Sequence, residues 1–458
     1  MWYRLYNLVL YLAFPVIVGL LLTKKRCQRG LWSRLGVVPQ ALQVLQSPVI
    51  WIHAASLGEV TAIVPLLRQV NVCHPQYSLV VSTVTETGHE VVVRQLEGVA
   101  LHCYAPIDFG WVVQRYVRAL RPRLFILVES ELWPNLLRSL HQHHVPVCLV
   151  NGRLSSRSYT RYRWIRKFMG HVLSHLNLAL MQTPVDAERI QALGADSASV
   201  HVTGNMKFDQ TMDQSDPRFA HDVLRASLGL SGEDVVLVAG STHPREEESL
   251  LGVYRMLLQS HPEVVLIMAP RHVERAAALE AVVHQFGMAC IRRSQLTSHP
   301  GKREADDAGT VILLDSRGEL PFVYQLGLVG FVGGTLVPVG GHNLLEPAQW
   351  GRPVMFGPYI DHCRDLARLL LDEGGAIQVT NQHELLSHMI HVVEDPLVAN
   401  QMGQRALAAV ARHRGVTANN LQWIDRLLGV PQSPTGSQAM NLGAPFEAKS
   451  FRAEGSHS

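Results

Sequence analysis

The chain has 458 residues, of which 47% are hydrophobic and 17% charged, with 24 prolines and 35 glycines. This composition excludes a disordered or collagen-like protein, and the length predicts two or three packed domains rather than one small binding module. The formal net charge is only +3, from 41 basic and 38 acidic residues, which is too small for the general footprint of a nucleic-acid-binding protein.

An apolar segment followed by cations lies near the N-terminus. Leu5–Leu22 spans 18 residues without a charge, about the lower limit for a helix that crosses a membrane. The cations at 24–26 follow the segment, whereas a secretory signal carries them before it and ends in a small-residue cleavage site. We therefore expect an uncleaved membrane-anchor helix, with the bulk of the chain in the cytoplasm. A buried or interfacial helix is the alternative, because Asn7, Pro15 and Gly19 weaken a span.

Short apolar runs then alternate with helical patterns, which predicts an α/β protein with doubly wound parallel sheets. The expected strands of the first half are Val49–Ala54, Leu79–Val84, Leu124–Val128, Val145–Val150, Leu178–Gln182 and Val200–Thr203. Those of the second half are Val235–Ala239, Val264–Met268, Val311–Leu314, Leu328–Val332 and Val354–Phe356.

Composition changes along the chain predict its domain boundaries. The polar segment FDQTMDQSDPRF has no apolar periodicity and separates the two halves, and the tail from Pro431 is rich in Ser, Pro and Gly. We expect an anchor with its basic flank at 1–30, a Rossmann-like domain at 31–207, a linker at 208–220, a second Rossmann-like domain at 221–430 and a disordered tail at 431–458.

Basic and aromatic residues alternate between Arg153 and Lys167. The cations are Arg153, Arg157, Arg161, Arg163, Arg166 and Lys167, and the rings are Tyr159, Tyr162 and Trp164. This mixture suits a membrane headgroup zone or a phosphate-bearing ligand, because cations pair with phosphates and rings lie at the interface. A solvated helix face is the competing interpretation.

Polar residues follow several predicted strands, where open parallel sheets bind their ligands. Glu59 begins the helix after the first strand and is either a partner of the helix dipole or a general base in a cleft. Glu129 ends an apolar strand, and Lys207 follows another close to the domain boundary. Both residues leave the same choice open.

A glycine-rich segment, Gly333–Pro347, precedes a helix expected to begin near Asn343. Backbone N–H groups in such a loop and the helix N-terminus favour a phosphate, although glycine often only supplies a positive φ. Glu346 could accept two ribose hydroxyls or complement the helix dipole.

Two further turns offer nucleotide contacts. Arg271 closes an apolar strand, where its planar guanidinium could bind phosphate or form a surface ion pair with Glu274. Arg317–Glu319 also follows an apolar run and could contribute backbone contacts to a base, or be only a turn.

Several motifs of other protein classes are absent from the sequence. There is no G-x-x-x-x-G-K-[ST], which excludes a P-loop NTPase, and no clean G-x-G-x-x-G after a strand. The six cysteines are scattered, which predicts neither disulfides nor zinc, and no Asp-x-Asp suggests a hard cation. No metal site is predicted.

Seven motifs occur in a fixed order: HAASLGE, ESELWPN, NGRLSSRSY, GNMKFD, APRH, RGEL and GGTLVPVGGHNLLEP. With the single anchor before them, they resemble the 3-deoxy-D-manno-octulosonic acid (Kdo) transferases of lipopolysaccharide synthesis from Leu5 to Leu428. The resemblance implies a GT-B fold, two Rossmann-like domains facing a cleft. It implies CMP-Kdo as donor substrate and a lipid A precursor (lipid IVA) as acceptor at the cytoplasmic face of the inner membrane. Two transferred Kdo residues are expected by analogy, with no cofactor and no obligatory protein partner.

The resemblance also implies residue roles. The glutamate of the HAASLGE element is the family's general base, here Glu59, and Glu129 and Lys207 look like the residues that stabilise the transition state. The implied CMP contacts are Pro270, Arg271, Arg317, Gly318, Glu319, Asn343, Leu344, Leu345 and Glu346. Arg317 stands where the family pattern has an apolar residue such as methionine, a change that a backbone contact survives.

Three rival functions are weighed against this interpretation. Another membrane-bound GT-B transferase would use a UDP-sugar, and competition between CMP and UDP would separate the two. A non-catalytic nucleotide-binding protein need not retain Glu59, Glu129 and Lys207. A nucleotide-sugar epimerase is expected to carry a dinucleotide fingerprint and a Tyr-x-x-x-Lys pair, which the sequence lacks.

Overall fold

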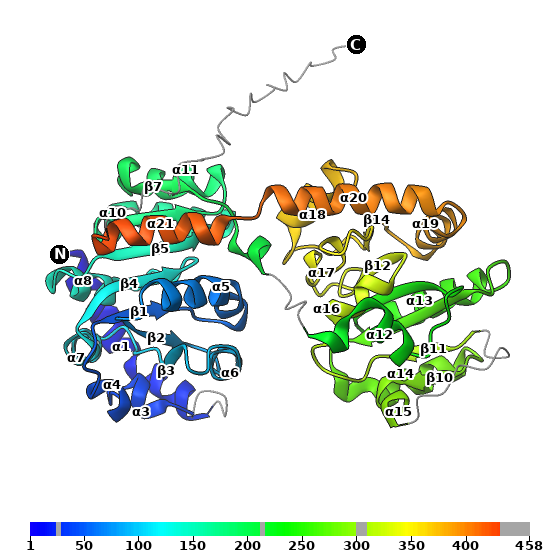
Figure 1. The fold of residues 1–458 in the computed structure, drawn as a ribbon. Coiled ribbons are helices and arrows are strands. Elements are labelled where there is room, and N and C mark those ends of the chain that lie inside the picture. Colours follow the sequence, from blue (N-terminus) through cyan, green and yellow to red (C-terminus); the bar gives the residue numbers. More distant parts are fainter. Residues whose placement is uncertain (24–28, 211–215, 299–308, 431–458) are drawn as a thin grey trace, which may run out of the picture.

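The computed structural model describes residues 1–23, 29–210, 216–298 and 309–430, which form two parallel α/β units (Figure 1). The strands of the first unit are β1 (Val49–His53), β2 (Ser78–Thr83), β3 (Ala100–Tyr104), β4 (Pro122–Val128), β5 (Val147–Gly152), β6 (Leu178–Met181) and β7 (Val200–Val202). Those of the second unit are β8 (Val235–Thr242), β9 (Val264–Pro270), β10 (Cys290–Arg292), β11 (Val311–Leu313), β12 (Val329–Val332), β13 (Val354–Phe356) and β14 (Ala376–Gln378). The predicted α/β class with two Rossmann-like sheets is confirmed.

Helices connect the parallel strands, as they must when every neighbour runs in the same direction. The first unit contains α1 (Trp2–Thr23), α3 (Leu31–Arg34), α4 (Gln40–Gln43), α5 (Leu57–Cys73), α6 (Glu86–Gln95), α7 (Gly110–Leu120), α8 (Pro134–Gln142), α9 (Ser156–Trp164), α10 (Arg166–Leu173) and α11 (Pro184–Ala192). The second contains α12 (His221–Ser227), α13 (Glu246–Leu257), α14 (Ala276–Gln285), α15 (Arg293–Ser298), α16 (Leu320–Val323), α17 (Leu345–Ala348), α18 (Arg364–Asp372), α19 (Gln382–Glu394) and α20 (Pro396–Arg412). The last helix is α21 (Val416–Leu428).

Each sheet changes its winding direction once. The strands of the first pair in the order β3-β2-β1-β4-β5-β6-β7, and those of the second in the order β10-β11-β9-β8-β12-β13-β14. The direction therefore reverses between β1 and β4 and between β8 and β12. Loops diverge at such a point and leave a crevice beyond the carboxyl ends of the strands, which is where ligands of open α/β sheets bind.

The eleven predicted strands are all present, with ends that differ by a few residues. Three strands were not predicted: β3, β10 and β14, each of which lies at the edge of its sheet. The burial of β3 alternates between half-exposed and exposed until Cys103, so it lacks the continuous apolar run that marks a strand covered on both faces. A search for apolar runs therefore missed β3, although it found β7 at the other edge of the same sheet.

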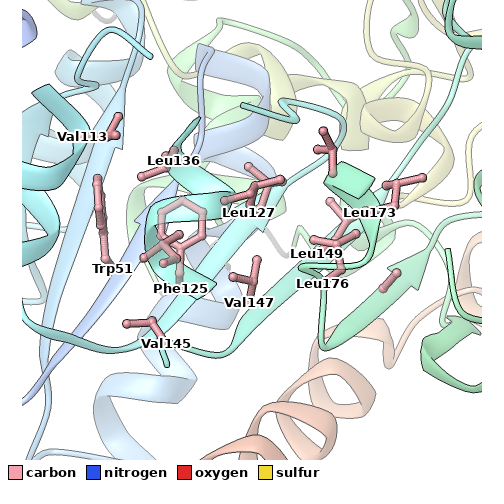
Figure 2. Packing of buried hydrophobic residues seen from close by; sticks show 14 of the residues in the cluster. Trp51, Val113, Phe125, Leu127, Leu136, Val145, Val147, Leu149, Leu173 and Leu176 are labelled. Carbon is pink, nitrogen blue, oxygen red and sulfur yellow. The ribbon is translucent and has the colours of Figure 1, made fainter. Parts of the chain in front are cut away.

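One face of the first sheet packs around Trp51 (Figure 2). The Trp51 ring meets Phe125 edge to face, with ring centroids 5.0 Å apart, and stacks on Tyr116 at 6.0 Å. The indole N–H donates to the Ser82 hydroxyl at 2.9 Å, so the one polar atom of this buried ring has a partner. The tight packing holds β1 and β4 rigidly beneath the crevice.

The chain returns to the first unit at its end. Although α21 falls within the range 221–430 predicted for the second domain, its Val416, Ile424 and Leu428 belong to the core of the first sheet. Asp209 accepts the Gly415 N–H at 2.7 Å and also the Thr417 N–H, and it thereby caps α21. The two units are thus joined twice, through residues 206–220 and through α21 (Figure 1). The predicted tail, 431–458, and residues 211–215 of the linker lie outside the described residues.

The N-terminal segment differs from the expected membrane-spanning anchor. Among the described residues, no helix is long and apolar enough to cross a membrane. The helix α1 is instead docked against the first unit: Trp2, Tyr3 and Tyr6 pack on its core. Asn7, which weakened the span in sequence, exchanges amide hydrogen bonds with Asn135 of α8 at 2.6 and 3.2 Å. The cations at 24–26 lie outside the described residues.

Asp108 is the polar contact that holds α1 in place. Its carboxylate accepts the Asn135 N–H at 2.9 Å and the Leu136 N–H at 2.8 Å, which caps α8, and it also accepts the Tyr6 hydroxyl at 2.9 Å. The opposite face of α1 is apolar and exposed, with Leu12 73% and Val16 65% accessible. The helix is therefore docked on the first unit along one face, and its other face is apolar and exposed.

We predict that Asp108→Ala loosens α1. The substitution leaves buried N–H groups of α8 without an acceptor, at a cost of about 1–3 kcal/mol, and removes the partner of Tyr6. Amide hydrogen exchange across α1 should accelerate, and the midpoint of thermal unfolding should fall. The matched control is Asp196→Ala, which removes an exposed cap from Ala198. Unchanged exchange in α1 would show that its apolar contacts alone dock it.

Candidate active site

Glu59 lies in the first turn of α5, directly beyond β1, and is 8% exposed. Its carboxylate accepts the Ala55 N–H at 2.8 Å and the Ser56 hydroxyl at 2.9 Å. Ser56 in turn caps the helix by accepting the Glu59 N–H at 3.4 Å. Burial raises the pKa of Glu59 to about 7, and the charge of Glu129 adds to this, while the Ala55 and Ser56 hydrogen bonds oppose it. A carboxyl that titrates near neutral pH can serve as a general base.

Glu129 stands across the same crevice, immediately after β4. Its φ is +59°, a left-handed conformation that is uncommon outside glycine, and its N–H donates to the Val150 carbonyl at 3.0 Å. The strained turn ends the strand abruptly and exposes the residue at the switch point. Glu129 lines a small cavity together with Arg153.

Lys207 is positioned by two asparagines. Asn151, buried at the end of β5, accepts the Met206 N–H at 3.0 Å, and Asn205 accepts the Lys207 N–H at 3.0 Å. These bonds form a short 3₁₀ turn, Met206–Asp209, that carries the lysine towards the second unit. Asn151 itself has a left-handed φ of +53°, which no sequence motif predicted.

A cavity of about 850 Å³ lies between the two units. The first unit lines it with Leu57 and Gly58, next to Glu59, and with Lys207. The second unit lines it with residues 341–345 and with α18. The cavity therefore brings the surroundings of the predicted base, one predicted stabilising cation and part of the predicted nucleotide segment to one place.

The remaining predicted nucleotide contacts are arranged differently from one another. The side chains of Leu344 and Leu345 are buried in the core of the second sheet, so only their backbones are available to a ligand. Glu346 accepts the Asn343 side-chain amide at 3.3 Å, and burial raises its pKa to about 7. Pro270 is the last residue of β9. The N–H of the following Arg271 donates to the carbonyl of Thr242, the last residue of β8, at 3.0 Å.

The charged side chains of the turn at 317–319 form ion pairs outside the cavity. Arg317 pairs with Glu274, which the sequence offered as a partner for Arg271. Glu319 pairs with Arg293 at 3.2 Å. Neither residue lines the cavity between the units, and Gly318, with φ +88°, leaves only backbone for a ligand here.

Several N–H groups of the glycine-rich loop have partners within the second unit. The Gly334 N–H donates to the buried carboxylate of Glu246 at 2.6 Å, and the Leu336 N–H donates to it at 3.3 Å. The N–H groups of Gly340 and Gly341 donate to the Gly334 carbonyl. The helix α17 has four residues and begins at Leu345, two residues after the predicted start near Asn343. The loop is thus a folded support held by Glu246.

The basic segment after β5 divides between two places. Arg153 faces the space between the units, where its guanidinium lies 3.7 Å from Asp365 of α18. Tyr159 and Tyr162 pack on the core of the first unit, while Trp164 is 88% exposed. The two tyrosines are therefore half-buried, whereas five of the six cations, from Arg157 onward, are exposed.

Sequence reasoning missed Glu246 and the histidines around it. Glu246–Glu248 resembles an ordinary acidic first turn that complements a helix dipole, and only the fold shows that Glu246 turns inward while Glu248 is exposed. His243 and His342 lie in the two loops that flank the switch point of the second sheet. No spacing pattern joins residues 99 positions apart.

Comparison with known proteins identifies the family. Residues 29–210 match the family model described as 3-deoxy-D-manno-octulosonic-acid transferase (kdotransferase). A 3-deoxy-D-manno-octulosonic acid transferase of Haemophilus influenzae is 32% identical over 421 residues, which cover 91% of this chain and 96% of that protein. The chain belongs to the Kdo transferase family. A Kdo transferase of Bordetella pertussis is 31% identical over 84% of this chain and 88% of its own length.

Solved structures place the Kdo transferase chain in a GT-B-like architecture. The UDP-GlcNAc 2-epimerase of Neisseria meningitidis, bound to UDP-GlcNAc, has a TM-score of 0.55 at 11% identity and covers 83% of this chain and all of its own. A glycosyltransferase of Rickettsia africae has a TM-score of 0.55 at 9% identity, over 84% of this chain and 99% of its own. Epimerases thus share this fold, so the missing dinucleotide fingerprint is no argument against an epimerase function. Membership of the Kdo transferase family is the argument against it.

We predict that Glu246 supports the glycine-rich loop of this Kdo transferase. Glu246→Ala removes the acceptor of the Gly334 and Leu336 N–H groups and should cost about 2–3 kcal/mol of stability in the second unit. Urea unfolding followed by hydrogen exchange in residues 333–341 measures both effects. The neighbouring Glu248→Ala removes the same charge from an exposed position and should leave exchange unchanged. Equal effects of the two variants would contradict a supporting role.

Proposed function

We propose that this protein transfers Kdo with inversion from CMP-Kdo to a lipid A precursor, lipid IVA, at the cytoplasmic face of the inner membrane. The observation that carries the proposal is the buried carboxylate of Glu59 at a switch point, beside a cavity shared by both units. Two Kdo residues per acceptor remain the expected number. The Kdo transferase relatives support the sugar, and the residues around the cavity support the reaction type.

The reaction requires a base on the acceptor side. An acceptor hydroxyl attacks the anomeric carbon of Kdo, its proton passes to the Glu59 carboxylate, and the bond from that carbon to the CMP phosphate breaks on the opposite face. Glu59 is suited to this because burial raises its pKa to about 7, so it holds a basic carboxylate at physiological pH. The proposal makes Glu59 the general base.

The departing phosphate gathers negative charge that fixed cations offset. Lys207 lines the cavity, and Arg271 lies close enough to lower the pKa of both His342 and Glu346 by its charge. Positive groups held in place before the reaction stabilise a developing anion without reorganisation. The scheme assigns this task to Lys207 and Arg271 and uses no metal ion, while Glu129, whose own charge is negative, keeps the transition-state role that the family resemblance implies.

We predict that Glu59→Gln abolishes transfer and leaves nucleotide binding intact. The amide keeps the size of the side chain but cannot accept the proton, so the rate should fall by a factor of about 10²–10⁴. Transfer from CMP-Kdo to tetraacylated lipid A precursor is measured by mass spectrometry of the products, whose mass increment counts the sugars. Persistent transfer by a folded Glu59→Gln variant would exclude Glu59 as the base.

The pH dependence supplies an internal control for this assignment. Because the pKa of Glu59 is raised, kcat/KM should rise with pH through about 7 as the carboxyl loses its proton. Ser56→Ala removes a hydrogen bond that favours the charged form and should move this limb to higher pH. A limb that does not move between Ser56→Ala and the parent protein belongs to another group.

The membrane attachment is proposed to be interfacial. The exposed face of α1 carries Leu5, Leu8, Val9, Leu12 and Val16, and further exposed rings are Trp32 and Trp164. A helix with one buried face and one apolar face lies in the headgroup zone rather than across the bilayer. The exposed cations from Arg157 to Lys167 would pair with lipid phosphates, which keeps the acceptor close to the cavity.

We predict that the exposed arginines of α9 serve the lipid acceptor. Arg157→Gln, Arg161→Gln and Arg163→Gln together should raise KM for the lipid precursor by about tenfold or more, since each removed charge near a membrane loses about 1 kcal/mol of attraction. The CMP dissociation constant should not change. Arg121→Gln, in an exposed loop of the same unit, is the matched control. Equal loss of lipid use and CMP binding would mean that α9 only supports the fold.

A further inference from the structure

Two histidines meet across the switch point of the second sheet. His243 follows β8 and His342 follows β12, the two strands between which the winding reverses. Their Nε2 atoms lie 2.8 Å apart, and the rings are parallel within 7° at a centroid separation of 5.1 Å. His342 lines the cavity between the units. The pair thus stands where an open α/β sheet binds its ligand.

The backbone around His243 is strained on both sides. Ser241 has a φ of +56° and Arg245 a φ of +76°, both in the left-handed region that favours glycine. The His243 N–H donates to Glu246 at 2.8 Å, and the same carboxylate holds Gly334. Strain kept by surrounding hydrogen bonds is common where a side chain must be held for a ligand.

The two rings share one proton. A hydrogen bond between two Nε2 atoms needs a hydrogen on one and a lone pair on the other, so a neutral pair holds a single N–H between them. One further proton from solvent, taken up on the free Nδ1 of the donor ring, gives an imidazolium that donates to an imidazole, a stronger charge-assisted bond. The pair can therefore gain one positive charge without losing its geometry.

The charged neighbours keep this pair neutral while no anion is present. The groups that face it are Arg271, His272, Arg275, His362, Glu246 and Glu247. Arg275 and Thr242 occupy the Glu247 carboxylate, and the Glu246 carboxylate is engaged by backbone N–H groups. Burial, with the charges of Arg271 and His243, lowers the pKa of His342 to about 4, and burial lowers that of His243.

We propose that His243 and His342 bind the phosphate of the donor nucleotide and that one proton enters the pair as this anion arrives. The inference rests on the proposed function and deepens it by naming the group that meets the phosphate beside Arg271. An anion in the crevice brings a negative charge close to the two rings. Because an opposite charge nearby stabilises the charged form, the anion favours the imidazolium. Donor binding is then coupled to proton uptake.

The test is isothermal titration calorimetry of the full chain in detergent with CMP, at one pH in buffers of different ionisation enthalpy. The dependence of the heat on the buffer counts protons, and we expect uptake of about one proton per CMP near pH 7. Cytidine, which has no phosphate, should bind without uptake. CMP binding by the unaltered protein with no uptake, or with release, would overturn the proposal.

Variants assign the proton to the pair. His342→Gln and His243→Gln should each abolish the uptake and weaken CMP binding by about tenfold or more, the loss typical of a charge-assisted hydrogen bond. His272→Gln is the matched control, because its ring lies 6.2 Å from His243 but outside the pair, and it should retain the uptake. Uptake retained in both pair variants would overturn the assignment even if either variant binds less well.

The same titrations separate this inference from the proposed function. Binding of UDP in place of CMP would contradict the proposed donor, yet uptake with UDP that depends on both histidines would still support the phosphate site. CMP binding without proton uptake would be consistent with CMP-Kdo as the donor but would contradict the proposed role of the histidine pair. Binding of neither nucleotide would overturn both.

Discussion

Parallel pairing of β1 with β4 and of β8 with β12 determines where this protein can hold a substrate. At both places the strand order reverses, so the loops that follow the two strands run in opposite directions. They leave an open crevice between them, and the side chains of these loops can face a ligand there. Glu59 and Glu129 stand on the two sides of the first crevice, and His243 and His342 on the two sides of the second. The buried cores beneath them are rigid, which fixes these side chains relative to one another.

Three buried glutamates have similar pKa values, but their hydrogen-bond partners differ and suit them to different roles. Burial raises the pKa of Glu59, Glu246 and Glu346 to about 7 in each case. Glu246 accepts three backbone N–H groups and so has no free role, which makes it a structural support. Glu59 accepts one backbone N–H and one hydroxyl, and it keeps lone pairs for a proton from an acceptor. The number of hydrogen-bond donors that already occupy the carboxylate, rather than its pKa, distinguishes a general base from a structural support.

The sequence predicted what depends on local pattern and missed what depends on distant contact. Central strands are continuous apolar runs because both faces are covered, and all of them were found, whereas β3, β10 and β14 at the edges were not. The apolar segment at the N-terminus was correctly read as a helix. Its docking on the first unit involves Asp108 and Asn135, more than a hundred residues away, and no local pattern contains them.

The candidate site divides in the same way. Glu59, Glu129 and Lys207 lie in recognisable sequence motifs and were therefore predicted, although their roles remain proposals. Asn151, which fixes the turn before Lys207, and Glu246, which fixes the glycine-rich loop, act through backbone contacts that span 55 and 88 residues. The fold alone is also insufficient, because epimerases and transferases share it at about 10% identity. Function must therefore be argued from the residues of the site rather than from the fold.

The charges between the two units suggest how substrate binding and domain approach are linked. Arg153 of the first unit and Asp365 of the second are 3.7 Å apart, and their side chains are 38% and 64% exposed. An exposed pair at this distance contributes about 0–1 kcal/mol, so it holds the units together only weakly. Arg153 can therefore exchange Asp365 for an anionic substrate at little cost. Lys207 and Arg368 line the same cavity from opposite units. A donor with phosphate and carboxylate groups would thus supply negative charge to cations of both units, and its binding would hold the units together more firmly than the Arg153–Asp365 pair does.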